Sequence, residues 1–341
     1  MHFAKGAALA LAVGIAMLLP AAPSLAAEVN LYTTREPGLI KPLLEAFTKK
    51  TGIAVNTVFV STGLPERVEA EGANSPADVL MTVDIGNLAD LVDAGVTQPI
   101  EAGALEAVVP ANLRDPGKHW FALSARARVL YATKDIDLTS FTYEELADPK
   151  WKGKICIRSG QHPYNIALIA AYIAKHGLAD AEVWLTGLKA NLAHRPAGGD
   201  REVARDILGG LCRIGVGNSY YVGLMRSGAG GPEQKAWGDG IKVILPTFAG
   251  GATHVNISGI AIAKNAPNKA NAYALLDYLA SDEGQQLFAH ANFEYPIKAD
   301  VAPDPIIAAL GTLHPDPSSL VDIESHRKEA SELVDNVGFD N

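Results

Sequence analysis

The distribution of apolar and polar positions predicts that the chain opens as an alternating series of strands and helices. Residues 39–50 show this well, because Leu39, Leu43 and Phe47 recur on one face of an amphipathic helix. A β-α-β-α-β-α order of this kind predicts a parallel sheet covered by helices. The expected strands cover residues 29–34, 53–60 and 77–82, and the expected helices cover 39–50, 62–72 and 87–94.

A second α/β unit follows, flanked by two long extended segments at residues 119–131 and 254–264. Since the chain can cross between units near residues 126 and 254, we expect an α/β fold with two discontinuous lobes joined by two crossover strands. The predicted elements are strands at 154–157, 212–217 and 241–245, helices at 142–147, 163–176, 180–191, 201–209, 268–279 and 282–290, and a loop at 228–232. The predicted limits are 28–125 plus 254–305 for the first lobe, 126–253 for the second lobe and 306–341 for a helical C-terminal tail.

This arrangement predicts where a ligand would bind. Ligands of open α/β sheets sit beyond the carboxyl ends of the strands. In a protein with two lobes, those ends face a common cleft that can close by a hinge motion. We therefore expect the functional residues on the loops and helix starts that follow strands.

The first 26 residues have the pattern of a cleaved export signal. Lys5 supplies a positive charge, residues 7–19 are apolar but too few to span a bilayer, and Ser24-Leu25-Ala26 is a small-residue cleavage motif. We expect cleavage near Ala26 and export to the periplasm.

The chain has two cysteines, Cys156 and Cys212. An even pair in an oxidising compartment favours a disulfide, although two buried thiols remain the alternative. Closing a loop of this length would stabilise the fold by roughly 4 kcal/mol in the chain-entropy model.

Charge and motifs narrow the function classes. The formal net charge is −9 with scattered acidic residues, which argues against a nucleic-acid partner. The sequence has no phosphate-binding loop, no HExxH metalloprotease motif, no Gly-x-Ser-x-Gly turn and no Cys-x-x-Cys pair. We therefore expect a binding protein, and not an enzyme.

The adjacent tyrosines Tyr220 and Tyr221 are the most informative pair. They follow a short apolar run, and both phenols can converge on one point only if the strand ends there and the backbone turns, most simply into a helix. Gly215, Gly217 and Asn218 are residues that such a turn would use. The pair is either two half-buried aromatics or two phenolate ligands for a hard, highly charged cation.

Several stretches together resemble the bacterial periplasmic ferric-iron-binding proteins, which are the solute-binding components of iron(III) ABC importers, and especially their tyrosine-rich branch. The likeness covers nearly the whole mature chain. The stretches are 29–35 (VNLYTTR), 75–80 (SPADVL), 82–88 (TVDIGNL), 125–128 (ARAR), 149–153 (PKWKG), 218–221 (NSYY), 254–259 (HVNISG) and 294–296 (EYP). The resemblance implies the class II type of two-lobed periplasmic binding protein fold and an inner-membrane ABC permease as partner. A monomer fits this transport role.

The resemblance also implies functional residues. Tyr164, Tyr220 and Tyr221 match the family's iron-ligating tyrosines, and Arg126 matches a residue that faces a small synergistic anion such as carbonate. The other positions that match anion-binding groups are Ser159, Gly160 and Asn218.

The sequence departs from this pattern at Glu36-Pro37, where related proteins usually have His, often followed by Tyr. Glu36 is a hard oxygen donor and could ligate iron directly, or it could be a solvated turn carboxylate. The expected ligand set is therefore the three tyrosines with Glu36, or the three tyrosines with an anion and water.

The sequence thus predicts capture of Fe³⁺ in a cleft between the lobes and its delivery to an ABC permease. The alternatives are a protein of the same fold that binds another ligand, such as an anion or an organic phosphonate, and a secreted transferase-like enzyme.

Overall fold

A computed structural model describes Met1, residues 27–101 and residues 103–341 of the chain. The predicted signal segment and its cleavage site lie, apart from Met1, outside the described residues. Among the helices that are described, none is both long enough and apolar enough to cross a membrane.

The first lobe is built on the strands β1 (Glu28–Thr33), β2 (Ala54–Phe59) and β3 (Val79–Thr82), which pair in parallel in the order β2-β1-β3. The helices between and after them are α1 (Pro37–Thr51), α2 (Leu64–Glu71) and α3 (Ile85–Asp93). The next strand in the sheet is β9 (Val255–Ala263), and it runs antiparallel to β3. The prediction of a parallel sheet is therefore wrong for the complete lobe, because β9 returns from the second lobe in the opposite direction.

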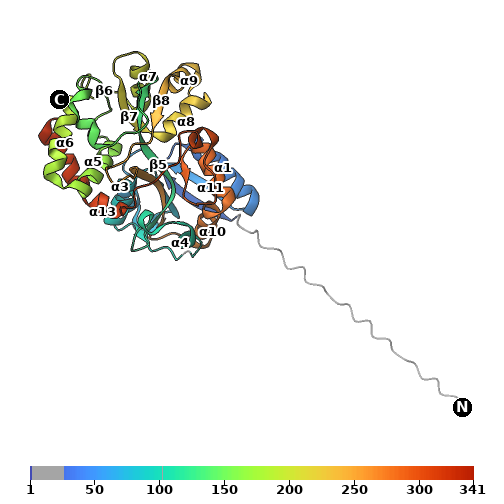
Figure 1. Cartoon of the computed structure of the whole chain (residues 1–341). Helices are drawn as coiled ribbons and strands as arrows, with labels where there is room; N and C mark the ends of the chain where they lie inside the picture. Colours follow the sequence, from blue (N-terminus) through green and yellow to red (C-terminus); the bar gives the residue numbers. More distant parts are fainter. Residues whose placement is uncertain (2–26, 102) are drawn as a thin grey trace.

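The strand β5 (Trp120–Thr133) belongs to both lobes (Figure 1). Its first half, up to Ala127, pairs with β9, and from Arg128 onward it pairs with β7 (Ile214–Asn218) and β8 (Ile241–Ile244). The shared strand and the returning β9 are the two predicted crossovers, so the predicted two-lobed α/β fold is confirmed. The exact domain limits stay a prediction.

The second lobe completes its sheet with β6 (Ile155–Cys156), which pairs in parallel with β7. Cys156 and Cys212 form a disulfide with a Cα–Cα distance of 5.8 Å, which joins β6 to the segment that enters β7. The helices are α5 (Pro163–His176), α6 (Leu178–Ala190), α7 (Asp200–Leu208), α8 (Ser219–Ser227) and α9 (Gly231–Gly240).

Two local predictions in this lobe are wrong. The predicted helix at 142–147 is a short 3₁₀ turn, Glu144–Ala147. The predicted loop at 228–232 runs into α9, which was not predicted because Gly231, Gly238 and Gly240 give its sequence a low helix propensity.

The C-terminal part is helical, as predicted, but it is not a free tail. The helices after β9 are α10 (Lys269–Ala280), α11 (Asp282–Asn292), α12 (Pro305–Ala308), α13 (Leu320–Ser325) and α14 (Arg327–Val337). The last of them, α14, packs on α5 and α6, and α13 contacts both α3 and α5. The end of the chain therefore lies against the second lobe (Figure 1). Phe339 is buried there, beside Gly160.

Candidate metal centre

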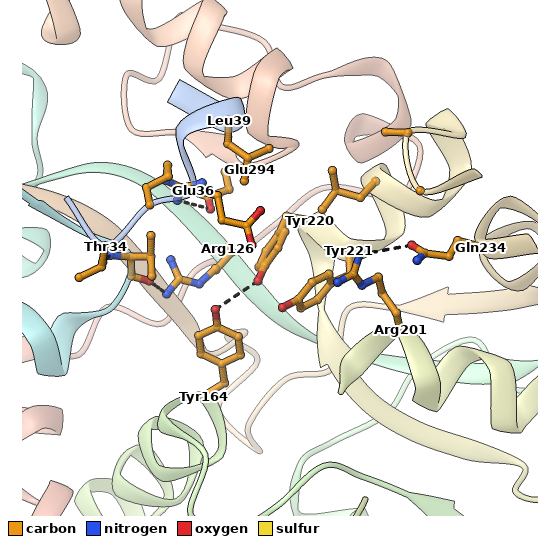
Figure 2. A pocket seen from close by; sticks show the side chains of 15 residues that line it. Thr34, Glu36, Leu39, Arg126, Tyr164, Arg201, Tyr220, Tyr221, Gln234 and Glu294 are labelled. Atoms are coloured by element: carbon orange, nitrogen blue, oxygen red, sulfur yellow. Dashed lines mark hydrogen bonds and ion pairs between the residues drawn. The ribbon is translucent and has the colours of Figure 1, made fainter. Parts of the chain in front are cut away.

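A cavity of about 420 Å³ lies between the two lobes. Its walls come from the turn before α1 and from β5 on one side, and from the starts of α5, α7 and α8 on the other (Figure 2). The lining residues are Thr34, Arg35, Glu36, Leu39, Val83, Arg126, Tyr164, Arg201, Tyr220, Tyr221, Leu224, Ala229, Gly230, Gln234 and Glu294.

Three tyrosine hydroxyls converge in this cavity, as Figure 2 shows. Tyr164 is the second residue of α5, and Tyr220 and Tyr221 lie in the first turn of α8. The Tyr164 and Tyr220 hydroxyl oxygens are 3.2 Å apart, and the Tyr220 and Tyr221 ring centroids are 4.1 Å apart. The structure therefore brings together the three tyrosines that the sequence singled out.

The chain changes from strand β7 to helix α8 at Ser219, and this change directs Tyr220 and Tyr221 into the cavity. The Ser219 hydroxyl accepts a hydrogen bond from the Ala127 backbone N–H of β5, which fixes the start of α8 against the shared strand. Gly215 and Gly217 lie inside β7 and not in the turn, contrary to expectation. A Cβ at Gly217 would lie 2.4 Å from the Tyr131 ring, so this glycine is needed for close packing.

The environment keeps the paired phenols protonated while no cation is bound. Burial raises the pKa of Tyr220 well above 10, and the neighbouring Tyr164 and Tyr221 raise it further. Burial also raises the pKa of Tyr221, with Tyr164 and Asp200 adding to the effect. A bound cation reverses this preference, because its charge stabilises the phenolate.

A buried polar network beneath the cavity holds the tyrosine-bearing segments. The Arg128 guanidinium donates to Asp200 Oδ2 at 2.6 Å, to Asn165 Oδ1 at 2.6 Å and to Asn218 Oδ1 at 3.1 Å. Asn165 follows Tyr164, and Asn218 is the last residue of β7. One side chain of β5 therefore ties the start of α5 to the start of α8. Asn218 serves this network and does not line the cavity.

Arg126 lies where the tyrosines meet the first lobe. Its guanidinium carbon is 5.3 Å from the centre of the Tyr164 ring, and it donates to the Val83 carbonyl. An Asp84 carboxylate oxygen lies 3.6 Å away. Burial raises the pKa of Asp84, although the charge of Arg126 opposes this shift. Arg126 thus places a fixed positive charge beside the phenols.

Two carboxylates reach the cavity from the first lobe. Glu36 is exposed and immediately precedes α1. Glu294 is buried, forms an ion pair with Arg35 at 2.8 Å and accepts a hydrogen bond from Ser258 at 3.0 Å. Burial alone would raise the pKa of Glu294, but Arg35 and Arg126 outweigh it and lower the pKa. Glu36 is therefore the carboxylate that is free to approach a cation, since Glu294 is already paired.

The structure does not bring Ser159 and Gly160 to the cavity. The Ser159 hydroxyl and the Gly160 N–H donate to the Asp340 carboxylate at 2.6 and 2.7 Å. The Gln161 N–H adds a third contact at 3.2 Å. These residues do bind an anionic group, as their position before a helix favours, but in this structure that group belongs to the C-terminal segment.

Arg201, Gln234 and Glu294 are polar residues of the cavity to which the sequence assigns no role. Arg201 lies over the Tyr221 ring at 5.5 Å and donates to Gln234 at 3.3 Å. Glu294 lies in the family-like stretch 294–296, but the resemblance implies no role for it. Arg201 opens a predicted helix with no preceding strand, and Gln234 lies in the helix that was not predicted, so neither carried a signal for the cleft.

Comparisons with known proteins give a consistent result. Residues 32–286 match the family of bacterial extracellular solute-binding proteins. The chain is 38% identical to iron uptake protein A2 of Synechocystis sp. over 99% of this chain and 97% of that protein. A Bordetella ferric binding protein structure has 63% identity and a TM-score of 0.88, covering 92% of this chain and all of that one. A Trichodesmium structure in complex with iron and citrate ligands has 41% identity and a TM-score of 0.87, covering 92% of this chain and 99% of that one.

Proposed function

This chain belongs to the bacterial extracellular solute-binding protein family, and we propose that it captures ferric iron between its lobes and delivers it to an ABC permease. The observation that carries the proposal is the convergence of Tyr164, Tyr220 and Tyr221 in one interlobe cavity. Phenolate and carboxylate oxygens are hard donors, which suit a trivalent cation. The relatives named above are described by iron uptake, by ferric binding or by a complex with iron and citrate.

The proposed ligands are the three phenolates and Glu36. Glu36 lies on the first lobe and the tyrosines on the second, so a metal that contacts both sides favours the closed arrangement. A ligand shifts such an equilibrium only by its differential affinity for the two states. Because the open arrangement separates Glu36 from the phenols, the metal binds it less well.

The charges of this set suggest how the site is balanced. Three phenolates and one carboxylate carry four negative charges against the three positive charges of Fe³⁺, and Arg126 offsets the excess. Where Glu36 does not ligate, a small anion such as carbonate completes the sphere beside Arg126. Ser159 and Gly160 are left out of this anion site because they bind Asp340, and Asn218 is left out because it does not line the cavity.

The remaining parts of the proposal concern transport. The relatives include a protein named an Fe³⁺-binding periplasmic protein. We infer export to the periplasm with cleavage near Ala26, action as a monomer and transfer of iron to an inner-membrane permease.

The experiment that tests the proposal is a titration of the iron-free mature protein with ferric citrate. We expect a red to orange colour from phenolate-to-iron charge transfer, with one iron retained per chain after desalting. A folded protein that stays colourless and retains no iron would overturn the proposal. Citrate without iron is the control for binding of an anion alone.

A further inference from the structure

A second group of metal-binding side chains lies at the edge of the second lobe, away from the cavity. Cys156 is in β6, His194 follows α6 and Asp206 is in α7. Their ligand atoms all lie within 4.8 Å of one another. None of them lines the cavity between the lobes.

The spacing within this group matches that of zinc ligands. Cys156 Sγ is 3.4 Å from His194 Nε2, which is 3.8 Å from Asp206 Oδ2. Bonds of about 2.3 Å to sulfur and about 2.0–2.2 Å to nitrogen and oxygen in a tetrahedron separate sulfur from nitrogen by about 3.5–3.6 Å and nitrogen from oxygen by about 3.3–3.5 Å. The Cys156–His194 pair is already close to this spacing and the His194–Asp206 pair is slightly longer. The Cys156 and Asp206 ligand atoms lie within 4.8 Å of each other, and the two sulfurs, which are bonded in the disulfide, would have to move apart when a metal binds.

Neighbouring groups orient both non-sulfur ligands. His194 Nδ1 lies 2.6 Å from the Arg195 carbonyl oxygen, which can only accept, so Nδ1 carries the proton and Nε2 offers its lone pair toward the sulfur. Arg205 Nε donates to Asp206 Oδ1 at 3.0 Å and leaves Oδ2 facing the histidine. Protein metal sites orient their histidine and carboxylate ligands through such outer contacts.

The oxidation state of Cys156 determines whether this group can bind a metal ion. In the disulfide, Cys156 Sγ is bonded to Cys212 Sγ and is a poor ligand. Reduction by a phosphine transfers two electrons to the disulfide. The two sulfurs take up two protons, and the phosphine becomes its oxide with oxygen from water. The products are two adjacent thiols, and a metal ion that binds both as thiolates releases their protons to water.

We propose that Cys156, Cys212, His194 and Asp206 form a tetrahedral zinc site when the disulfide is reduced. His194 and Asp206 are partly exposed, so the ion enters from their side, while both sulfurs are buried. The disulfide and the zinc ion are then alternative cross-links between the same two segments. The oxidised chain holds β6 to the entry of β7 by a covalent bond, and the reduced chain holds them by the metal.

The test uses cobalt(II) as a spectroscopic substitute for zinc on the mature protein reduced with a water-soluble phosphine. We expect a sulfur-to-cobalt charge-transfer band that saturates near one equivalent and disappears on addition of zinc. The oxidised protein and a Cys156→Ser/Cys212→Ser variant should lack the band. Both retain the tyrosine cavity, so any cobalt bound there gives no sulfur signal.

The variant His194→Ala tests whether His194 binds the metal or whether the two thiols bind it without the other residues. We expect it to weaken cobalt binding by about 10–100-fold or more, the loss known for an outer partner alone. His290→Ala, a partly exposed histidine paired with Asp304, should leave the affinity unchanged. Cobalt binding that is unchanged in His194→Ala would overturn the proposal.

Reduction of the disulfide could unfold the protein, so circular dichroism is used to measure its helical content. If the reduced protein unfolds, cobalt is added before the reductant, and we expect the metal to preserve the helical signal of the reduced chain. No charge-transfer band in the folded reduced protein, or unfolding despite the metal, would also overturn the proposal.

Discussion

The hydroxyl oxygens of Tyr164 and Tyr220 lie 3.2 Å apart, although the two residues are 56 positions apart and on different helices. At this distance the two phenols share a hydrogen bond when neutral, and two phenolates would repel each other strongly without a cation between them. A cation bound between the two oxygens would remove this repulsion. This relationship underlies the first prediction.

Iron binding should release protons and weaken as the pH falls. Burial raises the pKa values of Tyr220 and Tyr221 above 10, so at neutral pH both are protonated and iron must displace a proton from each ligand phenol. Affinity should fall by up to about tenfold per pH unit for each proton released. Proton release measured in weak buffer on adding iron should decrease by about one in Tyr220→Phe. Release that is identical in the two proteins would remove Tyr220 from the ligand set.

Tyr220→Phe should shift or bleach the red-orange band and weaken iron binding by at least about tenfold, because one phenolate ligand is lost. The fold should be retained, since only one hydroxyl is removed. Tyr278→Phe is the matched control, because its hydroxyl contacts Glu283 in the first lobe. Absorption spectra and competition with citrate measure both effects. An unchanged spectrum in Tyr220→Phe would contradict the assignment.

Glu36→Gln tests the first-lobe half of the site. If the carboxylate ligates iron, its neutral replacement should weaken binding by about tenfold or more and slow the closure of the lobes on iron. Glu45→Gln on α1 is the control, because Glu45 is exposed and pairs with Lys41 at 3.7 Å, outside the cavity. Competition titrations measure affinity and small-angle scattering follows closure. Equal iron affinities in the two variants would show that Glu36 is not a ligand, and the ligand set would then be the three tyrosines with an anion and water.

Asn165→Ala should loosen Tyr164 without touching the metal ligands. Asn165 accepts from Arg128 and donates to the carbonyls of Arg158 and Ser159, so its loss should destabilise the start of α5 by roughly 1–3 kcal/mol. Iron affinity should fall with it.

The control for Asn165→Ala is Asn191→Ala. Asn191 is also buried in the second lobe and donates to two carbonyls, so it should cost similar stability but leave iron affinity unchanged. Thermal unfolding and iron competition, measured on both variants, separate a positioning role from a merely structural one. Parallel losses of affinity in both would argue against the specific role of Asn165.

Asp340→Asn should lower stability by about 1–2 kcal/mol, because a charged acceptor at the start of α5 is replaced by a neutral one. Its oxygens accept from Ser159, Gly160 and Gln161. The wavelength of the iron band should stay the same, since this contact lies outside the cavity. Asp322→Asn, an exposed carboxylate of α13, is the control for thermal unfolding. A changed iron spectrum in Asp340→Asn would contradict this and would indicate that Ser159 and Gly160 belong to the metal site.

The fold was predictable where local pattern determines local structure. The prediction for α5 is correct to the residue at both ends, because Pro163 begins the helix and Gly177 ends it. The direction of β9 was not predictable in this way, since it depends on a strand that returns from another lobe. The helix α9 was missed because packing against α8 overrides the low propensity of its glycines.

The three tyrosines of the candidate site were also predictable from the sequence. The other residues that contact them or line the cavity were not. Tyr220-Tyr221 is a local signal at a strand end. By contrast, Asp340 lies 180 positions from Gly160 and is an ordinary acidic residue in the sequence. Glu294 and Arg201 likewise reach the cavity through tertiary packing. Contacts between residues that lie far apart in the chain leave no periodic pattern in the sequence from which they could be predicted.

Arg126 and Arg128 are two positions apart on β5 and therefore point to the same face of the strand. The first lies beside Asp84 of one lobe, and the second binds Asp200 of the other. The pairing partner of β5 changes from β9 to β7 between these two residues. In a closure that bends β5 at this point, atoms near the axis would move least, so the two positive charges would keep nearly the same position while Glu36 approaches the tyrosines.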